Sequence, residues 1–96
     1  MSLRDLVSML PMEYLLKVID RKPELVNWRE LSANAELSEE FIEKYSDRVN
    51  WKDISQYQQL SEPFIERHAG KVDWKYISRF QKLSESFIEK HADEVD

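Results

Sequence analysis

Three consecutive segments of 23 residues, 26–48, 49–71 and 72–94, align with one another without a gap. The second and third segments are identical at 14 of their 23 positions, and all three agree at nine. The nine shared residues form the pattern V-x-W-x₃-S-x₄-L-S-E-x-F-I-E. Self-similarity at a fixed period predicts that each segment is one structural unit stacked on its neighbours. We therefore expect residues 26–96 to form an array of three repeats followed by the stub Val95–Asp96.

Residues 1–25 do not follow the repeat pattern, because they lack its Trp and its Leu-Ser-Glu. Val18 and Ile19 nevertheless fall one period before Phe41 and Ile42. The first unit of a solenoid has no neighbour on one side and is usually atypical. We predict a capping segment of two helices, at about 3–10 and 12–22, separated by Pro11.

Each repeat is predicted to contain two short helices. Asn27, Asn50 and Asp73 are favourable N-cap residues for the first helix, and apolar residues follow at a spacing of three, as in Trp51, Ile54 and Tyr57. Serine caps the second helix, at Ser38, Ser61 and Ser84.

The second helix is predicted to run for about eight to ten residues and to end near Asp47, Gly70 or Asp93, with Gly70 in the position of a C-terminal capping glycine. Helices this short are not stable alone in water, so their apolar faces must pack on adjacent repeats. The expected fold is all-α, a miniature α-solenoid of about eight short helices.

The pattern V-x-W-x-x-I-S-x-x-Q-x-L-S-E-x-F-I-E-x-H resembles a short helical repeat of uncharacterised phage, bacterial and large-virus proteins. The resemblance covers residues 26–96, and the first repeat departs from it at Leu31, Ala35 and Tyr45. It implies a phage or viral origin and a binding role, and it implies no catalytic residues.

Composition excludes several classes of function. The chain has no cysteine, one glycine and two histidines, so the sequence lacks a thiolate metal site and a glycine-rich phosphate loop. A net charge of −5 and the absence of a Lys/Arg run argue against direct binding to nucleic acid. No apolar run is long enough to cross a membrane. We predict a protein without enzymatic activity, metal or cofactor.

Four sets of repeated residues have a structural and a functional interpretation, and the structural one is favoured for each. Periodic tryptophans suit core packing better than ligand stacking. His68 and His91 suit a half-exposed position better than a metal site. The glutamates suit a solvated helix face, and the serines a helix contact in which the hydroxyl bonds back to a carbonyl. These glutamates and serines are Glu39, Glu43, Glu62, Glu66, Glu85, Glu89, Ser32, Ser55 and Ser78.

The positions that vary between repeats are candidates for a binding surface, since framework positions of a solenoid recur. They lie at the end of the first helix and in the loop that follows. The predicted partner-binding residues are Gln56, Tyr57, Gln59, Tyr76, Arg79 and Lys82. The alternative is that this surface varies because nothing constrains it.

Acidic residues gather in the first repeat, which has a net charge of −3. The predicted acidic patch consists of Glu36, Glu39, Glu40, Glu43 and Asp47. Such a patch can imitate a row of phosphates and occupy a basic nucleic-acid channel, as a phage-encoded inhibitor of a host nuclease would.

The last repeat has no following repeat in this sequence, so we expect Phe87, Ile88 and His91 to form an exposed apolar end. This end is predicted to self-associate, most simply as a two-fold dimer. The alternative is that the sequence is part of a longer array.

The leading functional hypothesis is a cytoplasmic, non-enzymatic protein–protein interaction module, acting in the host cell if it is encoded by a phage. The second is the acidic inhibitor of a nucleic-acid enzyme. The third is a structural spacer within a larger assembly.

Overall fold

The computed structural model describes residues 2–95, which contain eight α-helices, one short 3₁₀-helix and no strand. The elements are α1 (Leu3–Ser8), α2 (Met12–Arg21), η1 (Pro23–Leu25), α3 (Trp28–Asn34), α4 (Glu39–Lys44), α5 (Trp51–Tyr57), α6 (Glu62–Arg67), α7 (Trp74–Phe80) and α8 (Glu85–Lys90). The prediction of an all-helical chain is therefore confirmed for the described residues, and η1 was not predicted. None of these helices is both long and apolar enough to cross a bilayer.

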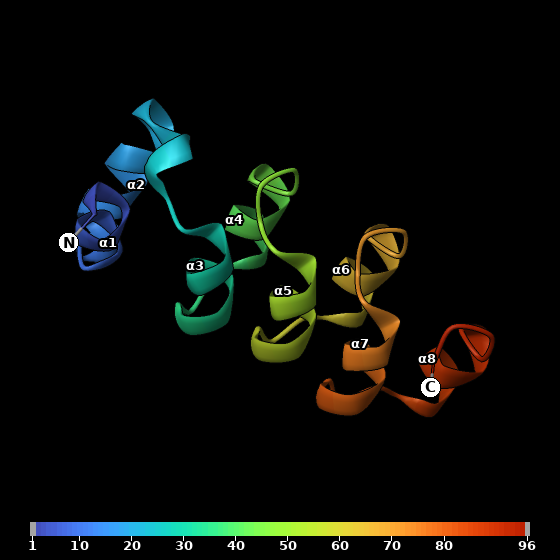
Figure 1. Cartoon of the computed structure of the whole chain (residues 1–96). Coiled ribbons are helices and arrows are strands. Elements are labelled where there is room, and N and C mark those ends of the chain that lie inside the picture. The colour runs from blue at the N-terminus through green and yellow to red at the C-terminus, as the bar shows by residue number, and fades with distance from the viewer. Residues whose placement is uncertain (1, 96) are drawn as a thin grey trace.

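The helices form two rows along an elongated molecule of 46 × 22 × 19 Å. The first helices of the repeats, α3, α5 and α7, lie side by side, and the second helices, α4, α6 and α8, form the other row (Figure 1). The capping helices α1 and α2 close one end, and α8 lies at the other (Figure 1). This regular stacking is what a 23-residue structural unit predicts.

Both sets of N-caps form as the sequence predicts. Asn27 and Asn50 accept hydrogen bonds from backbone N–H groups at 3.1 Å in each case. Ser38, Ser61 and Ser84 accept from the N–H of the Phe three residues later, at 3.1 to 3.3 Å. Each cap satisfies an amide that the first helical turn leaves unpaired.

The second helices are shorter than predicted, since each has six residues and ends at Lys44, Arg67 or Lys90. A turn follows, and the Trp of the next repeat binds one of its carbonyls. The Trp51 indole N–H donates to the Ser46 carbonyl at 2.9 Å, and the equivalent bond from Trp74 is 3.0 Å. In each of these turns the carbonyl accepts from a tryptophan side chain and not from the backbone N–H of a further helical turn.

Gly70 does not take the left-handed conformation of a C-terminal capping glycine, because no described residue has a positive φ. No atom lies within 4 Å of a Cβ placed there, so the fold does not need a glycine at this position. The predicted capping role of Gly70 is wrong, because the turn after α6 is right-handed and closed by bonds to the His68 carbonyl.

The core is a series of similar junctions between successive units. Between the first and second repeats it consists of Ile42, Val49, Ile54 and Phe64, and between the second and third of Ile65, Val72, Ile77 and Phe87. The isoleucine of one second helix is thus enclosed by three apolar residues of the next repeat. Each such burial contributes about 1.5–3 kcal/mol, which helices of six residues require.

The capping segment reproduces this junction with different residues. Ile19 occupies the position of Ile42 and is 1% exposed, within a cluster that also contains Val7, Leu15, Val26 and Leu31. The match of Ile19 to the repeat period is therefore confirmed. The N-terminal segment covers the face of the first repeat that a preceding repeat would cover.

A glutamine side chain joins each pair of repeats. The Gln58 amide nitrogen donates to the carbonyls of Ser32 and Ala35 at 2.8 and 2.7 Å, and its oxygen accepts from the Leu37 N–H at 3.0 Å. Gln81 makes the equivalent three bonds to the second repeat. Because Gln58 is buried, these bonds hold the end of α3 and the loop that follows it in the first repeat against the second repeat.

Serine and glutamate add further bonds between repeats. Ser32 donates to the Trp28 carbonyl at 2.6 Å, as predicted, and also accepts from the Asn50 N–H at 3.0 Å. Glu39 accepts from both the N–H and the hydroxyl of Ser61, at 2.6 and 3.0 Å. Glu62 repeats this pattern on Ser84. The glutamates therefore connect repeats as well as face solvent.

The two histidines also connect repeats. The His68 ring packs on Trp51 and Phe64, with centroids 5.2 and 4.5 Å away, and its Nε2 lies 3.3 Å from a Glu43 oxygen. His91 has the same environment in the third repeat. Their side chains are only 13% and 11% exposed, so the prediction of a half-exposed position underestimated their burial.

Removal of the glutamine bridge should destabilise the array. In Gln58→Ala, three backbone groups of the first repeat lose their partners, and we expect a loss of about 2–4 kcal/mol in the free energy of unfolding. Urea denaturation followed by circular dichroism measures it. Gln59→Ala, at the exposed neighbouring position, should change stability by less than about 0.5 kcal/mol. Equal midpoints for the two variants would contradict this role.

Acid should weaken one contact between the second and third repeats. A hydrogen bond from Lys90, aided by His91, lowers the pKa of Glu66 below its ordinary value of 4.5. Because the unfolded chain binds this proton more readily, the stabilisation is complete above about pH 4.5 and is lost as pH falls through the lowered pKa.

The variant Glu66→Gln should therefore lose less stability than the natural chain when urea midpoints are compared between pH 6 and pH 3, values chosen to span this range. Glu36→Gln is the control, since Glu36 makes no ion pair within residues 2–95. A pH dependence unchanged by Glu66→Gln would show that this contact contributes nothing.

Candidate interaction surface

The exposed side of α5 and α7 carries large aromatic side chains. Tyr57 is 56% exposed and Phe80 is 49% exposed, although both continue the apolar spacing of their helices. Each three-residue step falls about 60° short of a full helical turn, so two steps move a residue about 120° from the first. Trp and Ile therefore face the core, whereas Tyr57 and Phe80 face outward.

Two stacked aromatic rings on α7 are flanked by two cations, one from α5 and one from α7. The rings of Tyr76 and Phe80 stack at 6.1 Å with an interplanar angle of 11°. The Lys52 ammonium lies 5.3 Å from the Tyr76 centroid, and the Arg79 guanidinium 6.0 Å from that of Phe80. We call Lys52, Tyr76, Phe80 and Arg79 the aromatic–cationic row. Its two aromatic rings and its arginine are residue types enriched where proteins bind one another, and Lys52 adds a second positive charge.

Tyr57 and Gln59 lie beside a polar groove between the first and second repeats. The groove is formed by the loop before α4 and the end of α5, and its lining includes Asn34, Glu36 and Glu39. Its floor contains the Gln58 bridge, so its shape is fixed by the contact between repeats. Hydrogen-bonding groups on a rigid support are suited to recognition.

The predicted partner-binding residues thus separate into two groups. Tyr57 and Gln59 share the groove, while Tyr76 and Arg79 belong to the aromatic–cationic row. The half-buried Gln56 and the exposed Lys82 belong to neither group.

Sequence reasoning missed Lys52 and Phe80 as members of this surface. The sequence signal for Phe80 was its spacing of six residues from Trp74, which turns its side chain about 120° away from that of Trp74 around the helix. No sequence signal pairs Lys52 with Tyr76, because they come from different repeats.

The acidic patch is partly compensated by the second repeat. Glu43 lies 3.3 Å from Arg67 and Asp47 lies 3.3 Å from Lys71. The Glu39 carboxylate accepts two hydrogen bonds from Ser61. Glu36 and Glu40 are exposed and form no ion pair within the described residues. The patch therefore presents less negative charge than its five carboxylates suggest.

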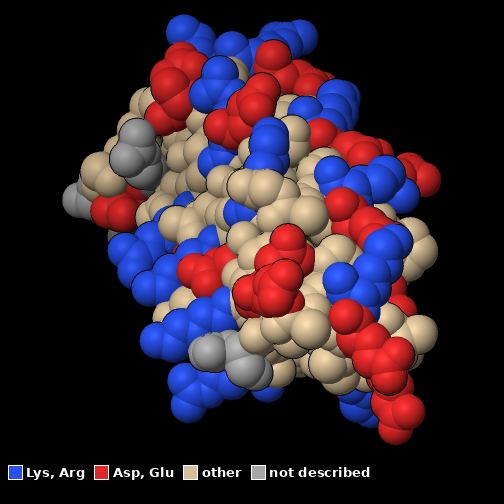
Figure 2. Space-filling model, turned by 90° about the vertical axis from the view of Figure 1, so that its right-hand side faces the viewer, with Lys and Arg blue, Asp and Glu red and all other residues tan. Residues whose placement is uncertain are grey.

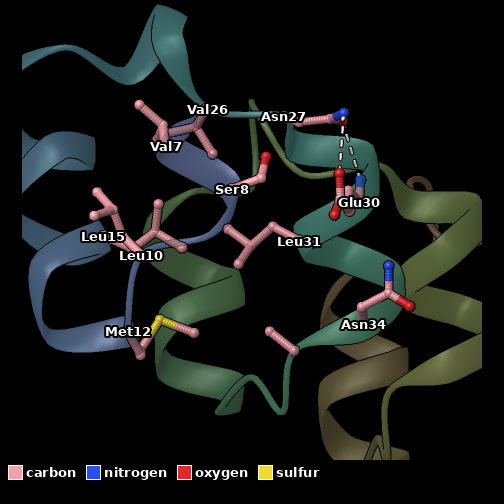
Figure 3. Close-up of a pocket in the computed structure, with 11 residues that line it drawn as sticks. Val7, Ser8, Leu10, Met12, Leu15, Val26, Asn27, Glu30, Leu31 and Asn34 are labelled. Carbon is pink, nitrogen blue, oxygen red and sulfur yellow. Dashed lines mark hydrogen bonds between the residues drawn. The ribbon is translucent and has the colours of Figure 1, made fainter. Parts of the chain in front are cut away.

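A half-open pocket of about 280 Å³ lies where the capping helices meet α3. Its apolar wall includes Val7, Leu15 and Leu31, and Asn27 and Glu30 form hydrogen bonds with each other at its edge (Figure 3). Ala35 also lines the pocket, at the repeat position that Gln58 and Gln81 occupy. The sequence signal for this pocket was the alanine at a position where the other two repeats have glutamine.

The predicted self-association residues have different environments. Ile88 is 42% exposed, whereas Phe87 is 5% exposed and His91 packs on Trp74 and Phe87. An exposed end formed by all three is therefore wrong for Phe87 and His91, because both contact their own repeat. Of the three, only Ile88 is exposed.

In the part of the chain that the structure describes, no group of three or more His, Asp or Glu side chains is placed so that it could hold a metal ion. The chain matches no known family model, and no curated protein and no solved structure is significantly similar to it.

Proposed function

We propose that this chain is a non-enzymatic interaction module that binds a protein partner through the exposed side of α5 and α7. The observation that supports the proposal is the aromatic–cationic row, in which Tyr76 and Phe80 are stacked and flanked by Lys52 and Arg79. None of these four residues belongs to the buried core at the junctions of the array. Large aromatic rings that lie outside the buried core are available to a partner.

The rigidity of the surface supports the same proposal. Neighbouring repeats are joined by buried isoleucines and by the Gln58 and Gln81 bridges, so α5 and α7 are held at a fixed separation. A surface that is ordered before binding loses little conformational entropy on association.

The partner suited to this surface is a protein with apolar or aromatic side chains and some acidic groups, because the row is cationic at both ends. We prefer this proposal to inhibition of a nucleic-acid enzyme, since Arg67 and Lys71 offset part of the acidic patch. The resemblance of the repeats to those of phage and large-virus proteins favours a role in the cytoplasm of a host cell, without direct binding to nucleic acid or membrane.

The proposal is tested with the variant Tyr57→Ser/Phe80→Ser, which removes two exposed rings and should keep the fold. A partner captured by the natural chain through crosslinking in cells should bind the variant about thirtyfold more weakly, as loss of one interface hot spot of about 2 kcal/mol requires. Binding is measured by titration with the purified partner.

Tyr14→Ser provides a matched control, because Tyr14 is 51% exposed on α2, away from the proposed surface. Its affinity for the partner should equal that of the natural chain. Equal binding by the double variant, or equal loss of binding in Tyr14→Ser, would place the interface elsewhere.

A further inference from the structure

The pocket between the capping segment and α3 lies where the array departs from its own repeat pattern. Gln58 and Gln81 bridge the two later junctions through hydrogen bonds to the preceding repeat. Ala35 occupies the same repeat position but has no side chain beyond its Cβ, so the first junction lacks this bridge. The half-open pocket of about 280 Å³ lies beside Ala35 (Figure 3).

The helices of the capping segment also pack differently from those of the repeats. The first helices of the repeats, α3, α5 and α7, pack directly on one another, whereas α1 packs mainly on α2 and η1. Leu10 and Leu15 of the capping segment lie on one side of the pocket, opposite Leu31 of α3 (Figure 3). The pocket is therefore set by how the cap meets the first repeat.

Apolar side chains form most of the pocket wall. Leu15 and Leu31 are buried, and the more exposed Leu10 adds apolar surface beside them. Pockets that bind small molecules are lined mainly by apolar side chains, with a few polar groups that orient the ligand. An apolar cavity of about 150 Å³ holds one benzene ring, so this larger pocket has room for a ring and a short chain attached to it.

The edge of the pocket is acidic. Among the described residues that line it, Glu30 alone is charged. The Asn27 side-chain amide donates to a Glu30 oxygen at 3.4 Å and positions the carboxylate at this edge (Figure 3). A carboxylate accepts several hydrogen bonds, so Glu30 keeps acceptor capacity for a ligand. Charge complementarity therefore favours a cation at the edge of the pocket and disfavours an anion.

We propose that this pocket binds a small aromatic amine, a compound with one aromatic ring system and a short chain that ends in an ammonium group. The ring packs against Leu10, Leu15 and Leu31, and the ammonium group donates to the Glu30 carboxylate. The site shares no residue with the aromatic–cationic row, so this proposal and the proposed function succeed or fail separately.

The test titrates the full chain with tryptamine and follows the backbone amide signals of Leu31 and Ala35 by NMR. Saturable shifts of these signals are expected, with a Kd at or below about 1 mM, a modest affinity for a ligand of about a dozen heavy atoms. Indolepropionate has the same ring but a carboxylate in place of the amine. It should bind about tenfold more weakly, because Glu30 repels it.

A further probe separates the contribution of the ring from that of the charge. Acidic side chains are also exposed at the opposite end of the molecule, where Glu85 and Glu89 belong to α8 (Figure 2). An ammonium group alone is therefore attracted to several places on the surface. Ethylamine, which has the charge without the ring, should not produce saturable shifts at Leu31 and Ala35.

Two substitutions copy residues of the second repeat into the first and form a matched pair. Ala35→Gln introduces the side chain of Gln58, which should fill the pocket and weaken tryptamine binding more than about tenfold. Ala33→Gln introduces the side chain of Gln56 on α3 outside the pocket, and its affinity for tryptamine should equal that of the natural chain. Circular dichroism checks that both variants keep their helices.

Glu30→Gln removes the charge at the edge of the pocket. Tryptamine and indolepropionate should then bind with affinities within about twofold of each other. Glu30 is exposed and lies outside the core, so this variant keeps the proposal testable if Ala35→Gln does not fold.

Three results would overturn the proposal. The first is the absence of saturable shifts at Leu31 and Ala35 in the natural chain. The second is equal binding of tryptamine by a folded Ala35→Gln variant. The third is equal affinity of the natural chain for tryptamine and indolepropionate, because the acidic edge would then not select the ligand.

Discussion

The burial of one isoleucine per unit under the following unit is the interaction on which the structure depends. Helices of six or seven residues do not persist alone, so α4 and α6 exist because Ile42 and Ile65 are enclosed by the next repeat. The stability of such an array comes from contacts between neighbours and not from one central core. Ile19 shows that the constraint extends to the capping segment, where the rest of the repeat pattern is absent.

Apolar burial alone does not fix how two repeats are rotated on each other, and the polar contacts do so. Gln58 is bonded to three backbone groups of the previous repeat, and Ser32 bonds the backbone at the start of α5. A buried amide with three partners has few alternative positions, so it specifies one arrangement. The ion pairs of Glu43 and Glu66 lie at the surface and add less.

The division between framework and free surface follows from these contacts. Nearly every residue of the repeat pattern faces a neighbouring unit, whereas Tyr57, Tyr76 and Phe80 lie on the outside of α5 and α7. The sequence alone did not separate these groups fully. Gln58 belongs to the same variable stretch as Gln59, yet the structure shows that Gln58 is a buried bridge between repeats whereas Gln59 is exposed beside a groove.

The sequence by itself determined the all-helical class, the repeat length, the N-caps and the atypical capping segment, because these depend on local preferences and on a period written into the chain. Only the tertiary structure decided the early end of the second helices, the inward packing of Phe87 and His91, and the inter-repeat roles of Gln58 and Glu39. The bonds of Gln58 and Glu39 join atoms about one repeat apart in the chain, and the other two features depend on tryptophan side chains that lie outside the second helix. Local helix propensity does not predict which polar side chain forms hydrogen bonds with the backbone of the adjacent repeat, because the stacking of the repeats decides it.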